Sequence, residues 1–394
     1  MLSKKAKSMT PSVTLGISTK VKEMKADGIE VTNLSIGEPD FFTPKNAKNA
    51  AEVAIKNNKT KYDAAPGLLE LRKAISKKLM VENNLMYGVD EIVVSNGAKH
   101  AITNALIALV DPGEEVIIPK PYWVSYPEMV KLTGGVPVFV ETEKSNNFKL
   151  TVAELKAAIT DKTKVLFITN PSNPTGAVYT KEELEPIVNL CIKKNIFILA
   201  DEIYEKICYL DEFTSIASFG DAAKDITITV NGFSKSAAMT GWRLGYTATN
   251  KTLSKAISGI QGHLVSHPCT ISQWAAVEAL TSCDADMQKM VTAYKSRRDE
   301  AADLIKEIPG LSLIQPDGAF YLFVDMSSIK EKLQFDDSFS LEICARLLED
   351  HKLAVVPGIA FGNDDFIRLS YAADINEIKI GIEKIKSFVV GLNL

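Results

Sequence analysis

The segment NGFSKSAAMTGWRLGY, residues 231–246, places a lysine between two serines, after the apolar run ITITV and before a second apolar stretch. A surface loop is the usual place for a lysine, because this side chain is almost never fully buried without a partner. The apolar flanks argue against such a loop here. Burial lowers the pKa of an amine, and the neutral amine can attack a carbonyl to form a Schiff base. Lys235 is therefore the first candidate for covalent chemistry.

Pyridoxal phosphate is the cofactor most often held by a lysine Schiff base, and it needs further partners. Its pyridine nitrogen stays protonated, and the ring withdraws electrons, only if a carboxylate lies beside that nitrogen. Asp201 follows the apolar run IFILA, where an unpaired carboxylate would be costly to bury. The alternative interpretation of Asp201 is an N-cap for the segment EIYEKI.

The cofactor's phosphate needs an anion site. Gly97 opens a predicted helix, and a helix N-terminus with a small residue binds anions readily; the alternative is a plain strand-to-helix turn. Arg243 follows Lys235 by eight residues and can hold a phosphate through two hydrogen bonds. Ser234 can add a hydroxyl group.

The cofactor ring itself needs hydrogen bonds and a flat surface. Asn173 and Tyr204 are the candidates for hydrogen bonds to the ring's 3-oxygen. Trp123 offers a face on which the ring can stack, although a tryptophan of the core is the alternative.

Short apolar runs alternate with amphipathic segments through the middle of the chain. This pattern predicts an α/β domain whose mainly parallel sheet is covered by helices on both faces. Ligands of such sheets bind at the carboxyl ends of the strands, which is where the candidates lie. The predicted strands are residues 91–95, 115–119, 136–141, 164–169, 196–202, 226–230 and 243–249.

The last third of the chain has a different pattern. A long helix is predicted over residues 284–308, and short strands and helices follow it to the C-terminus. We predict a large domain over residues 44–284 and a smaller α+β domain over residues 1–43 and 285–394.

Composition excludes several classes of protein. The chain has 394 residues, 46% of them hydrophobic, and a net charge of −4, so it has no basic surface for nucleic acid. No run of apolar residues is long enough to span a membrane, and no secretory signal is present. The five cysteines lack CxxC spacing, which is typical of a cytoplasmic protein. The histidines show no metal-binding motif, so no metal is expected.

Four motifs in sequence order resemble those of the class I/II aminotransferases of fold-type I: NPSNPTG, ADEIYE, SKSAAMTGWRLGY and FIRLSYA. The resemblance covers the whole chain and includes LSIGEPDF and KYDAAPGLLELRKAI. It is greatest to the bacterial aspartate aminotransferase subgroup, whose signatures include TKY, PYWVSYPEMV and MTGWR.

The resemblance implies a role for each matching residue. Lys235 matches the lysine that binds the cofactor and moves a proton between the substrate α-carbon and the cofactor. Asp201 matches the partner of the ring nitrogen. The other implied cofactor ligands are Tyr204 and Asn173 at the 3-oxygen, Trp123 over the ring, and Gly97, Ala98, Lys99, Ser234 and Arg243 around the phosphate. Many relatives have glycine or serine where this chain has Ala98, but a backbone donor survives that change. Tyr62 matches a tyrosine that reaches the phosphate from the other subunit, which implies a homodimer.

The substrate ligands also follow from the resemblance. Arg368 matches the arginine that binds the α-carboxylate, with the backbone of Gly37 beside it; composition alone would make Arg368 a surface charge on an edge strand. Trp123 and Asn173 also border the substrate. Lys99 and Thr14 match residues that bind the distal carboxylate, although a solvent-exposed helix face is the alternative for Lys99.

The implied activity is amino transfer between an L-amino acid, aspartate first, and 2-oxoglutarate, giving oxaloacetate and glutamate. Aromatic, alanine and arogenate/prephenate substrates stay open, as does a C–S lyase on the same fold. A regulatory or structural cofactor-binding protein would need a DNA-binding appendage or a broken site, and the chain has neither. A nucleotide-binding dehydrogenase is disfavoured because GxGxxG is absent.

Overall fold

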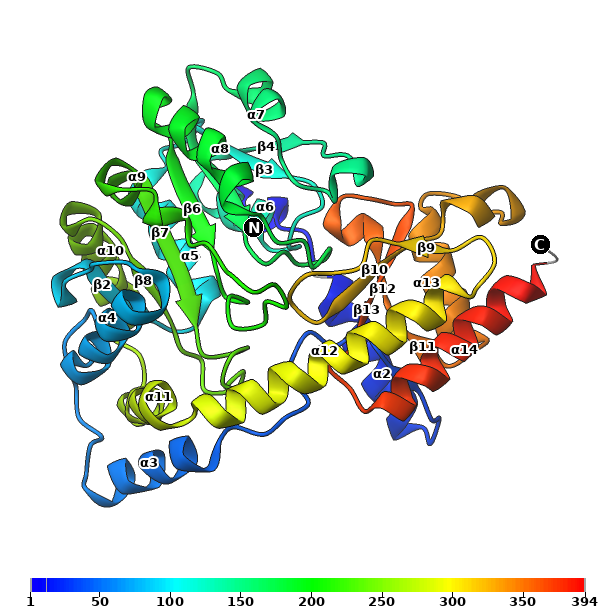
Figure 1. Ribbon diagram of the computed structural model, residues 1–394, viewed down its shortest axis with the longest axis horizontal. Helices are drawn as coiled ribbons and strands as arrows, with labels where there is room; N and C mark the ends of the chain where they lie inside the picture. Colours follow the sequence, from blue (N-terminus) through cyan, green and yellow to red (C-terminus); the bar gives the residue numbers. More distant parts are fainter. Residues whose placement is uncertain (1, 12, 393–394) are drawn as a thin grey trace.

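The computed structural model describes residues 2–11 and 13–392, and its larger part is built on one twisted sheet of seven strands (Figure 1). The strand order is β2-β8-β7-β6-β5-β3-β4. All neighbours are parallel except β8, which is antiparallel to both β2 and β7. The strands are β2 (Ile92–Ser95), β3 (Glu115–Pro119), β4 (Val136–Val140), β5 (Thr163–Thr169), β6 (Phe197–Asp201), β7 (Thr227–Gly232) and β8 (Gly245–Ala248). The predicted mainly parallel sheet is confirmed.

Helices cover both faces of this sheet. Alternate residues of a strand point to opposite faces, and β5 shows both sides of the packing. Val165 and Phe167 join a core formed with α5 (Ala98–Leu109), α6 (Tyr126–Thr133) and α10 (Lys251–Val265). Leu166 and Ile168 join a second core, formed with α7 (Val152–Ala158) and α8 (Lys181–Lys194). The short α9 (Asp221–Ile226) also packs against α8, and a third core lies between the β2 edge and α3 (Lys45–Lys56), α4 (Leu69–Asn83) and α11 (Thr270–Ser282).

The last predicted strand of this sheet, 243–249, is shorter than expected. β8 begins only at Gly245, because Arg243 adopts a left-handed conformation with φ of 54°. L-residues rarely adopt that conformation, and an extended strand cannot contain it. The turn separates Arg243 from the strand, and its guanidinium lies beside Gly97 at the start of α5.

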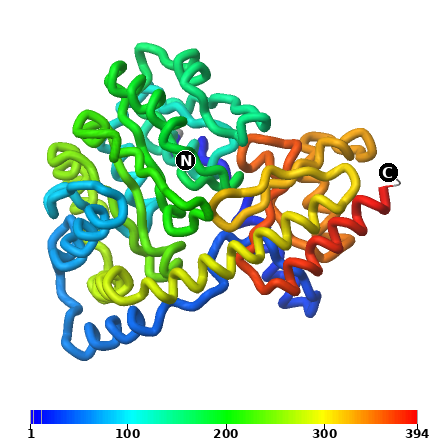
Figure 2. The backbone as a smooth tube through the Cα atoms, in the orientation of Figure 1, coloured from blue at the N-terminus to red at the C-terminus, as the bar shows by residue number. Residues whose placement is uncertain are grey.

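The C-terminal third forms a second, smaller group of elements (Figure 2). Its four-stranded sheet has the order β12-β13-β10-β9 and is antiparallel throughout. Its strands are β9 (Ser312–Leu313), β10 (Tyr321–Asp325), β12 (Val356–Pro357) and β13 (Phe366–Ser370). Its helices are α12 (Asp284–Lys306), α13 (Phe339–Glu349) and α14 (Ile375–Gly391). The long helix predicted over 284–308 is therefore confirmed to within two residues.

The N-terminal segment packs against this smaller group. β1 (Thr32–Asn33) pairs in parallel with β11 (Leu353–Ala354). Val21 and Met24 of α2 (Val13–Ala26) share a small apolar core with Leu348. These contacts support a small domain made of residues 1–43 and 285–394, and we propose that division of the chain.

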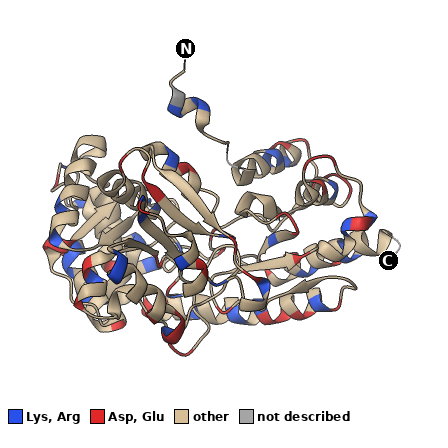
Figure 3. Cartoon of the chain, turned by 90° about the horizontal axis from the view of Figure 1, so that it is seen from above, with Lys and Arg blue, Asp and Glu red and all other residues tan. Residues whose placement is uncertain are grey.

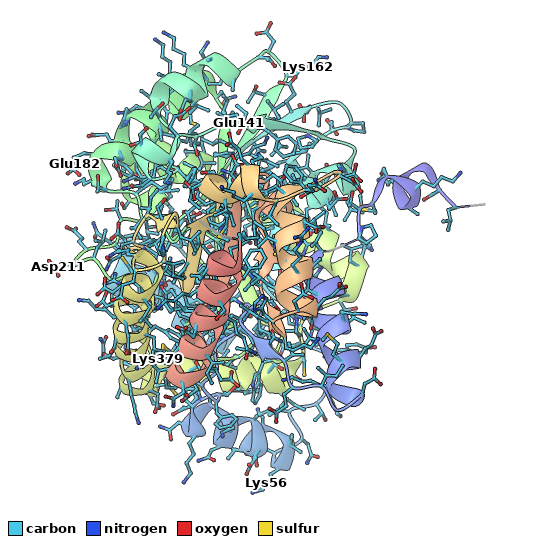
Figure 4. All side chains as sticks on the ribbon, turned by 90° about the vertical axis from the view of Figure 1, so that its right-hand side faces the viewer. Lys56, Glu141, Lys162, Glu182, Asp211 and Lys379 are labelled. Atoms are coloured by element: carbon cyan, nitrogen blue, oxygen red, sulfur yellow. The ribbon has the colours of Figure 1, made fainter. Side chains whose placement is uncertain are left out.

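The described surface is polar and mixed in charge. Lys and Arg positions lie among Asp and Glu positions along the chain (Figure 3), and side chains such as Lys162, Glu182 and Asp211 extend outward (Figure 4). The short helix α1 (Lys4–Ser8) stands away from the body in the same views. Among the described residues, no helix has the length and apolar character needed to cross a bilayer.

Candidate active site

A cavity of about 450 Å³ lies where the carboxyl ends of β5, β6 and β7 meet the N-terminal segment and the small sheet. Of the fourteen residues predicted from the sequence, all but Gly97 and Tyr62 line it. The lining includes Thr14, Gly37, Ala98, Lys99, Trp123, Asn173, Asp201, Tyr204, Ser234, Lys235, Arg243 and Arg368. Residues from both ends of the chain thus surround one space.

Lys235 lies in the turn that follows β7, with its ammonium group inside the cavity. Its Nζ donates a hydrogen bond to the backbone oxygen of Gly37 at 2.5 Å. Burial lowers the pKa of Lys235 to about 8, while the nearby carboxylate of Glu38 opposes this shift and Arg368 adds to it. An amine with this pKa is partly neutral under physiological conditions, and only the neutral form can act as a nucleophile or base.

Asp201 ends β6 and is almost completely buried. Its Oδ2 accepts a hydrogen bond from the hydroxyl of Tyr126 at 2.7 Å, and its Oδ1 accepts a longer one, 3.3 Å, from the backbone of Ile203. Burial raises the pKa of Asp201 to about 6. A buried carboxylate with few donors gains from a cation beside it, such as a protonated ring nitrogen.

Glu202, the next residue, is buried on the other side of the strand end. It accepts hydrogen bonds from Ser215 Oγ at 2.8 Å and from the backbone of Ile216 at 3.0 Å. Burial and then the nearby carboxylate of Glu205 raise the pKa of Glu202 to about 8. Glu202 therefore holds the 215–216 loop against the strand that carries Asp201, mainly as a neutral acid near pH 7.

This raised pKa predicts how stability changes with pH. Between pH 4.5 and 8 the folded chain binds one proton more at Glu202 than the unfolded chain, so stability falls by about 1.4 kcal/mol per pH unit in that window. Glu202→Gln removes this loss. We expect the difference between the thermal unfolding midpoint of the variant and that of wild type to increase in favour of the variant from pH 5 to pH 8. Glu185→Gln, on the exposed face of α8, is the control, and a difference between Glu202→Gln and wild type that stays constant with pH would contradict the assignment.

Gly97 and Arg243 form an open cradle at the N-terminus of α5. Gly97 has a φ of 88°, and a Cβ on it would lie 2.7 Å from the Arg243 guanidinium. A Cβ on Gly245 would lie 2.3 Å from the backbone nitrogen of Ala98. The N-cap residue, Gly97, has no side chain to cap the helix, so the first N–H groups of α5, the guanidinium and Ser234 surround a space suited to an anion.

Arg368 lies on β13, which is flanked by β12 and β10. It is only 3% exposed. The interpretation from composition alone, a surface charge on an edge strand, is therefore wrong. Its Nη1 donates to Asn173 Oδ1 at 2.9 Å, and its Nη2 donates to the backbone oxygen of Ser35 at 3.0 Å. Its Nε is buried and has no hydrogen-bond partner in the described part of the chain. A buried guanidinium without a carboxylate is suited to binding one from a substrate.

Lys99, in the first turn of α5, lies at the cavity wall. Its Nζ is 4.8 Å from the centre of the Trp123 ring. Burial and then the charge of Arg243 lower its pKa. Thr14, on α2, lines the same cavity. Lys99 is thus solvent-exposed and also borders the cavity, so the structure is compatible with both interpretations and its role stays a prediction.

Tyr62 is not brought to the cavity within one chain. It is 91% exposed, and its ring meets the edge of His267 with centroids 5.8 Å apart. Its predicted role requires a second subunit.

Among the cavity residues that the sequence did not single out, three make polar or cation–π contacts that bear on the site. Tyr126 binds Asp201, and Glu38 accepts a hydrogen bond from Thr240 at 2.9 Å. Tyr321 lies against Arg368, with the guanidinium 4.2 Å from its ring centre. Tyr126 and Glu38 stand inside the motifs PYWVSYPEMV and LSIGEPDF, so position within a motif was the available signal; Tyr321 opens an ordinary apolar strand and gave none.

The polar groups of this cavity fit pyridoxal phosphate. An amine of lowered pKa, a buried carboxylate and an anion cradle correspond to the three polar ends of that molecule. Among residues 2–11 and 13–392, no cluster of three His, Cys, Asp or Glu side chains could hold a metal ion.

Comparison with known proteins agrees with this chemistry. The family described as aminotransferase class I and II matches residues 29–385. The aspartate aminotransferase of Bacillus sp. (strain YM-2) is 45% identical over 390 residues, which cover 99% of each chain. The probable aspartate/prephenate aminotransferase of Aquifex aeolicus is 44% identical, with 98% of each chain covered.

Solved structures show the same fold. The aspartate aminotransferase of Rhizobium meliloti superposes with a TM-score of 0.94 at 39% identity, covering 99% of each chain. The aspartate aminotransferase of Thermus thermophilus with maleate gives a TM-score of 0.93 at 39% identity, covering 98% of this chain and 99% of the other. The chain therefore belongs to the class I and II aminotransferases, and it is a pyridoxal phosphate-dependent aminotransferase of fold-type I.

Proposed function

We propose that this enzyme transfers the amino group of L-aspartate to 2-oxoglutarate, giving oxaloacetate and glutamate. One observation carries the choice of substrate: besides Lys235 and Arg243, which the cofactor would occupy, two further basic side chains, Arg368 and Lys99, line the same cavity, and a dicarboxylic substrate has two carboxylates to bind. The names of the Bacillus, Rhizobium and Thermus relatives support the proposal, as does maleate, a dicarboxylate, in the Thermus structure.

The proposed cofactor ligands follow from the geometry. Lys235 would hold the cofactor covalently, and Asp201 would hold the charge of its ring nitrogen. Asn173 and Tyr204 would bind the 3-oxygen, and Trp123 would cover the ring. Gly97, Ala98, Ser234 and Arg243 would surround the phosphate, and Lys99, beside them on α5, would face the substrate.

Bound pyridoxal phosphate supplies an electron sink for the substrate α-carbon. The chain's own part is to orient and to move protons. Arg368 fixes the α-carboxylate, with the backbone of Gly37 beside it, and Asn173 keeps the guanidinium in place through its Oδ1. Lys235 Nζ takes a proton from the substrate as a general base, which its lowered pKa favours.

Lys99→Ala tests the substrate. We expect kcat/KM for aspartate to fall by about 1.5–3 kcal/mol, as for the loss of a charged hydrogen bond, and kcat/KM for an apolar or aromatic donor to change little. Initial rates with both donors measure this. Lys181→Ala, at the start of α8, is the surface control.

Equal losses for both donor classes, or no loss for either, would show that Lys99 does not bind the substrate side chain. A panel of amino donors with 2-oxoglutarate as acceptor measures the range of donors. Replacing 2-oxoglutarate with prephenate shows whether this enzyme also uses prephenate, which the name of the Aquifex relative includes. Elimination without transfer in the same assays would identify the lyase alternative.

We also propose that the active unit is a homodimer with shared sites, and that it works in the cytoplasm. Tyr62 is almost fully exposed and lies away from the cavity of its own chain, although its motif match is a phosphate ligand. A second subunit would bury it. All five cysteines are free thiols, which supports a reducing compartment.

Mixing chains that carry two different substitutions tests the shared site. Tyr62→Phe chains and Lys235→Ala chains, exchanged into mixed dimers, should give one site with both substitutions and one site with neither. We expect activity to rise above that of either parent. If subunits demonstrably exchange and activity does not rise, each site is complete within one chain.

A further inference from the structure

Tyr321, the first residue of β10, contacts two groups of the proposed site that come from different parts of the chain. It is buried, and it lines the cavity beside Gly37. Its hydroxyl meets Tyr204, which follows β6, and its ring meets Arg368, which lies on β13. One side chain thus touches both a proposed cofactor ligand and the proposed substrate ligand.

The hydroxyl contact is a direct hydrogen bond. Tyr204 Oη and Tyr321 Oη are 2.8 Å apart, and either atom can donate. The two rings meet edge to face, with centroids 5.9 Å apart and planes at 80°. Space for this arrangement depends on Gly37, because a Cβ on that residue would lie 2.8 Å from Tyr321 Oη.

The number of protons decides which phenol donates. Burial raises the pKa of both tyrosines, so each is neutral near pH 7 and has one proton. If Tyr204 donates to Tyr321, it has no proton left for an acceptor in the cavity. Tyr204 can donate to the cofactor's 3-oxygen only when Tyr321 donates to Tyr204. Within the described residues, Tyr321 Oη has no other hydrogen-bond partner.

The ring contact serves the arginine. The guanidinium carbon of Arg368 is 4.2 Å from the centre of the Tyr321 ring. Arg368 pairs across the strands with Phe323, so Tyr321 is its diagonal neighbour on the same face of the sheet. A cation over an aromatic face is attracted to it, more strongly when buried. Together with the ring of Phe361, whose centre is 4.9 Å from the same carbon, the Tyr321 ring limits the plane in which the guanidinium can lie.

We propose that Tyr321 is a positioning residue for both halves of the reaction: its hydroxyl directs the proton of Tyr204 toward the cofactor's 3-oxygen, and its ring holds Arg368 for the substrate carboxylate. The inference rests on the proposed function, which gives Tyr204 and Arg368 their ligands. A hydrogen bond accepted by Tyr204 also polarises its own O–H group and makes it a stronger donor.

Tyr321→Phe tests the hydroxyl, and the readout is the colour of the enzyme loaded with pyridoxal phosphate. A strong donor to the 3-oxygen stabilises its anionic form, so the proton of the bound cofactor is lost at lower pH. Removing the hydroxyl should raise the midpoint of the pH-dependent absorption change by about half to one pH unit, as expected for one hydrogen bond. The KM for aspartate should stay within about twofold, because the ring remains.

A double-mutant cycle shows whether the effect passes through Tyr204. Tyr204→Phe alone should raise the same midpoint, and adding Tyr321→Phe to it should raise the midpoint no further. Tyr209→Phe is the matched control. Tyr209 is a half-buried phenol that likewise meets another phenol, Tyr371, at 3.2 Å, but it lies outside the cavity, and removal of its hydroxyl should leave the midpoint unchanged.

Tyr321→Met tests the ring by comparison with Tyr321→Phe. We expect the KM for both aspartate and 2-oxoglutarate to rise about 3- to 30-fold beyond the phenylalanine variant, the range expected for losing a cation–π contact. Equal KM values in the two variants would overturn the role of the ring.

The possible outcomes distinguish a failure of the role proposed for Tyr321 from a failure of the proposed function. If Tyr204→Phe raises the midpoint and Tyr321→Phe does not, the role of the Tyr321 hydroxyl is overturned and the proposed function stands. If Tyr204→Phe also leaves the midpoint unchanged, the proposed role of Tyr204 fails, and this inference fails with it.

Discussion

Replacing Lys235 with alanine is expected to abolish measurable turnover, with kcat at least about 10⁴-fold below wild type. The amine is both the proposed attachment point and the proposed base, so one substitution removes two functions. Its surroundings support this double role, because burial lowers its pKa to about 8 while the backbone oxygen of Gly37 holds it inside the cavity.

The attachment can be measured without turnover. Borohydride reduction of the loaded wild-type enzyme, followed by peptide mapping, should place the cofactor on Lys235, and the alanine variant should give no adduct. Lys251→Ala, which removes a lysine paired with Asp90 on the surface, should behave as wild type. An adduct on any other lysine would make the central assignment wrong.

Replacing Asp201 with alanine is expected to cost about 3 kcal/mol or more of transition-state stabilisation, or at least about 100-fold in kcat. The buried carboxylate is fixed by Tyr126 before any ligand arrives, so it can stabilise a positive ring nitrogen without reorganising. A neutral ring would withdraw electrons far less well.

The fold should survive this change, because alanine removes a buried charge and adds no volume. Steady-state kinetics with aspartate, and circular dichroism as a check on the fold, measure the two effects separately. Asp201→Glu keeps the charge but moves it and should recover part of the lost rate. A folded alanine variant with turnover near that of wild type would exclude Asp201 as the partner of the ring nitrogen.

Much of the fold could be predicted because its strands are short apolar runs that end at polar residues. Asp201 and Lys235 stood out for this reason, since each follows a run that must be buried, and the structure places both in one cavity. The sequence pattern also predicted the helix α12 and the mainly parallel sheet. These features depend on residues close together in the chain.

Other features depend on residues that are far apart, and no local pattern could show them. Arginine is usually found on the surface, so composition alone would put Arg368 there. Only its motif, and the position of β13 between two other strands of the small sheet, indicate that it is buried. Tyr321 looks like any aromatic residue in a strand. Arg243 leaves its predicted strand through a left-handed turn, which an alternating pattern cannot show.

The hydrogen bond from Arg368 to the backbone oxygen of Ser35 joins residues 333 positions apart. The pairing of β1 with β11 closes a loop of similar length. Such contacts are the last to form, because a long loop must close before they contribute.

This has a consequence for synthesis on the ribosome, where N-terminal parts of a chain generally fold first. Here β1 and Ser35, near the N-terminus, can complete their contacts only after β11 and Arg368 have been synthesised. The strands that carry Asp201 and Lys235 can assemble while translation continues, but the carboxylate-binding half of the site is complete only when the chain is nearly finished. A nascent or truncated chain that lacks β13 would therefore have the proposed cofactor residues without Arg368, so it could bind the cofactor before it could hold a substrate.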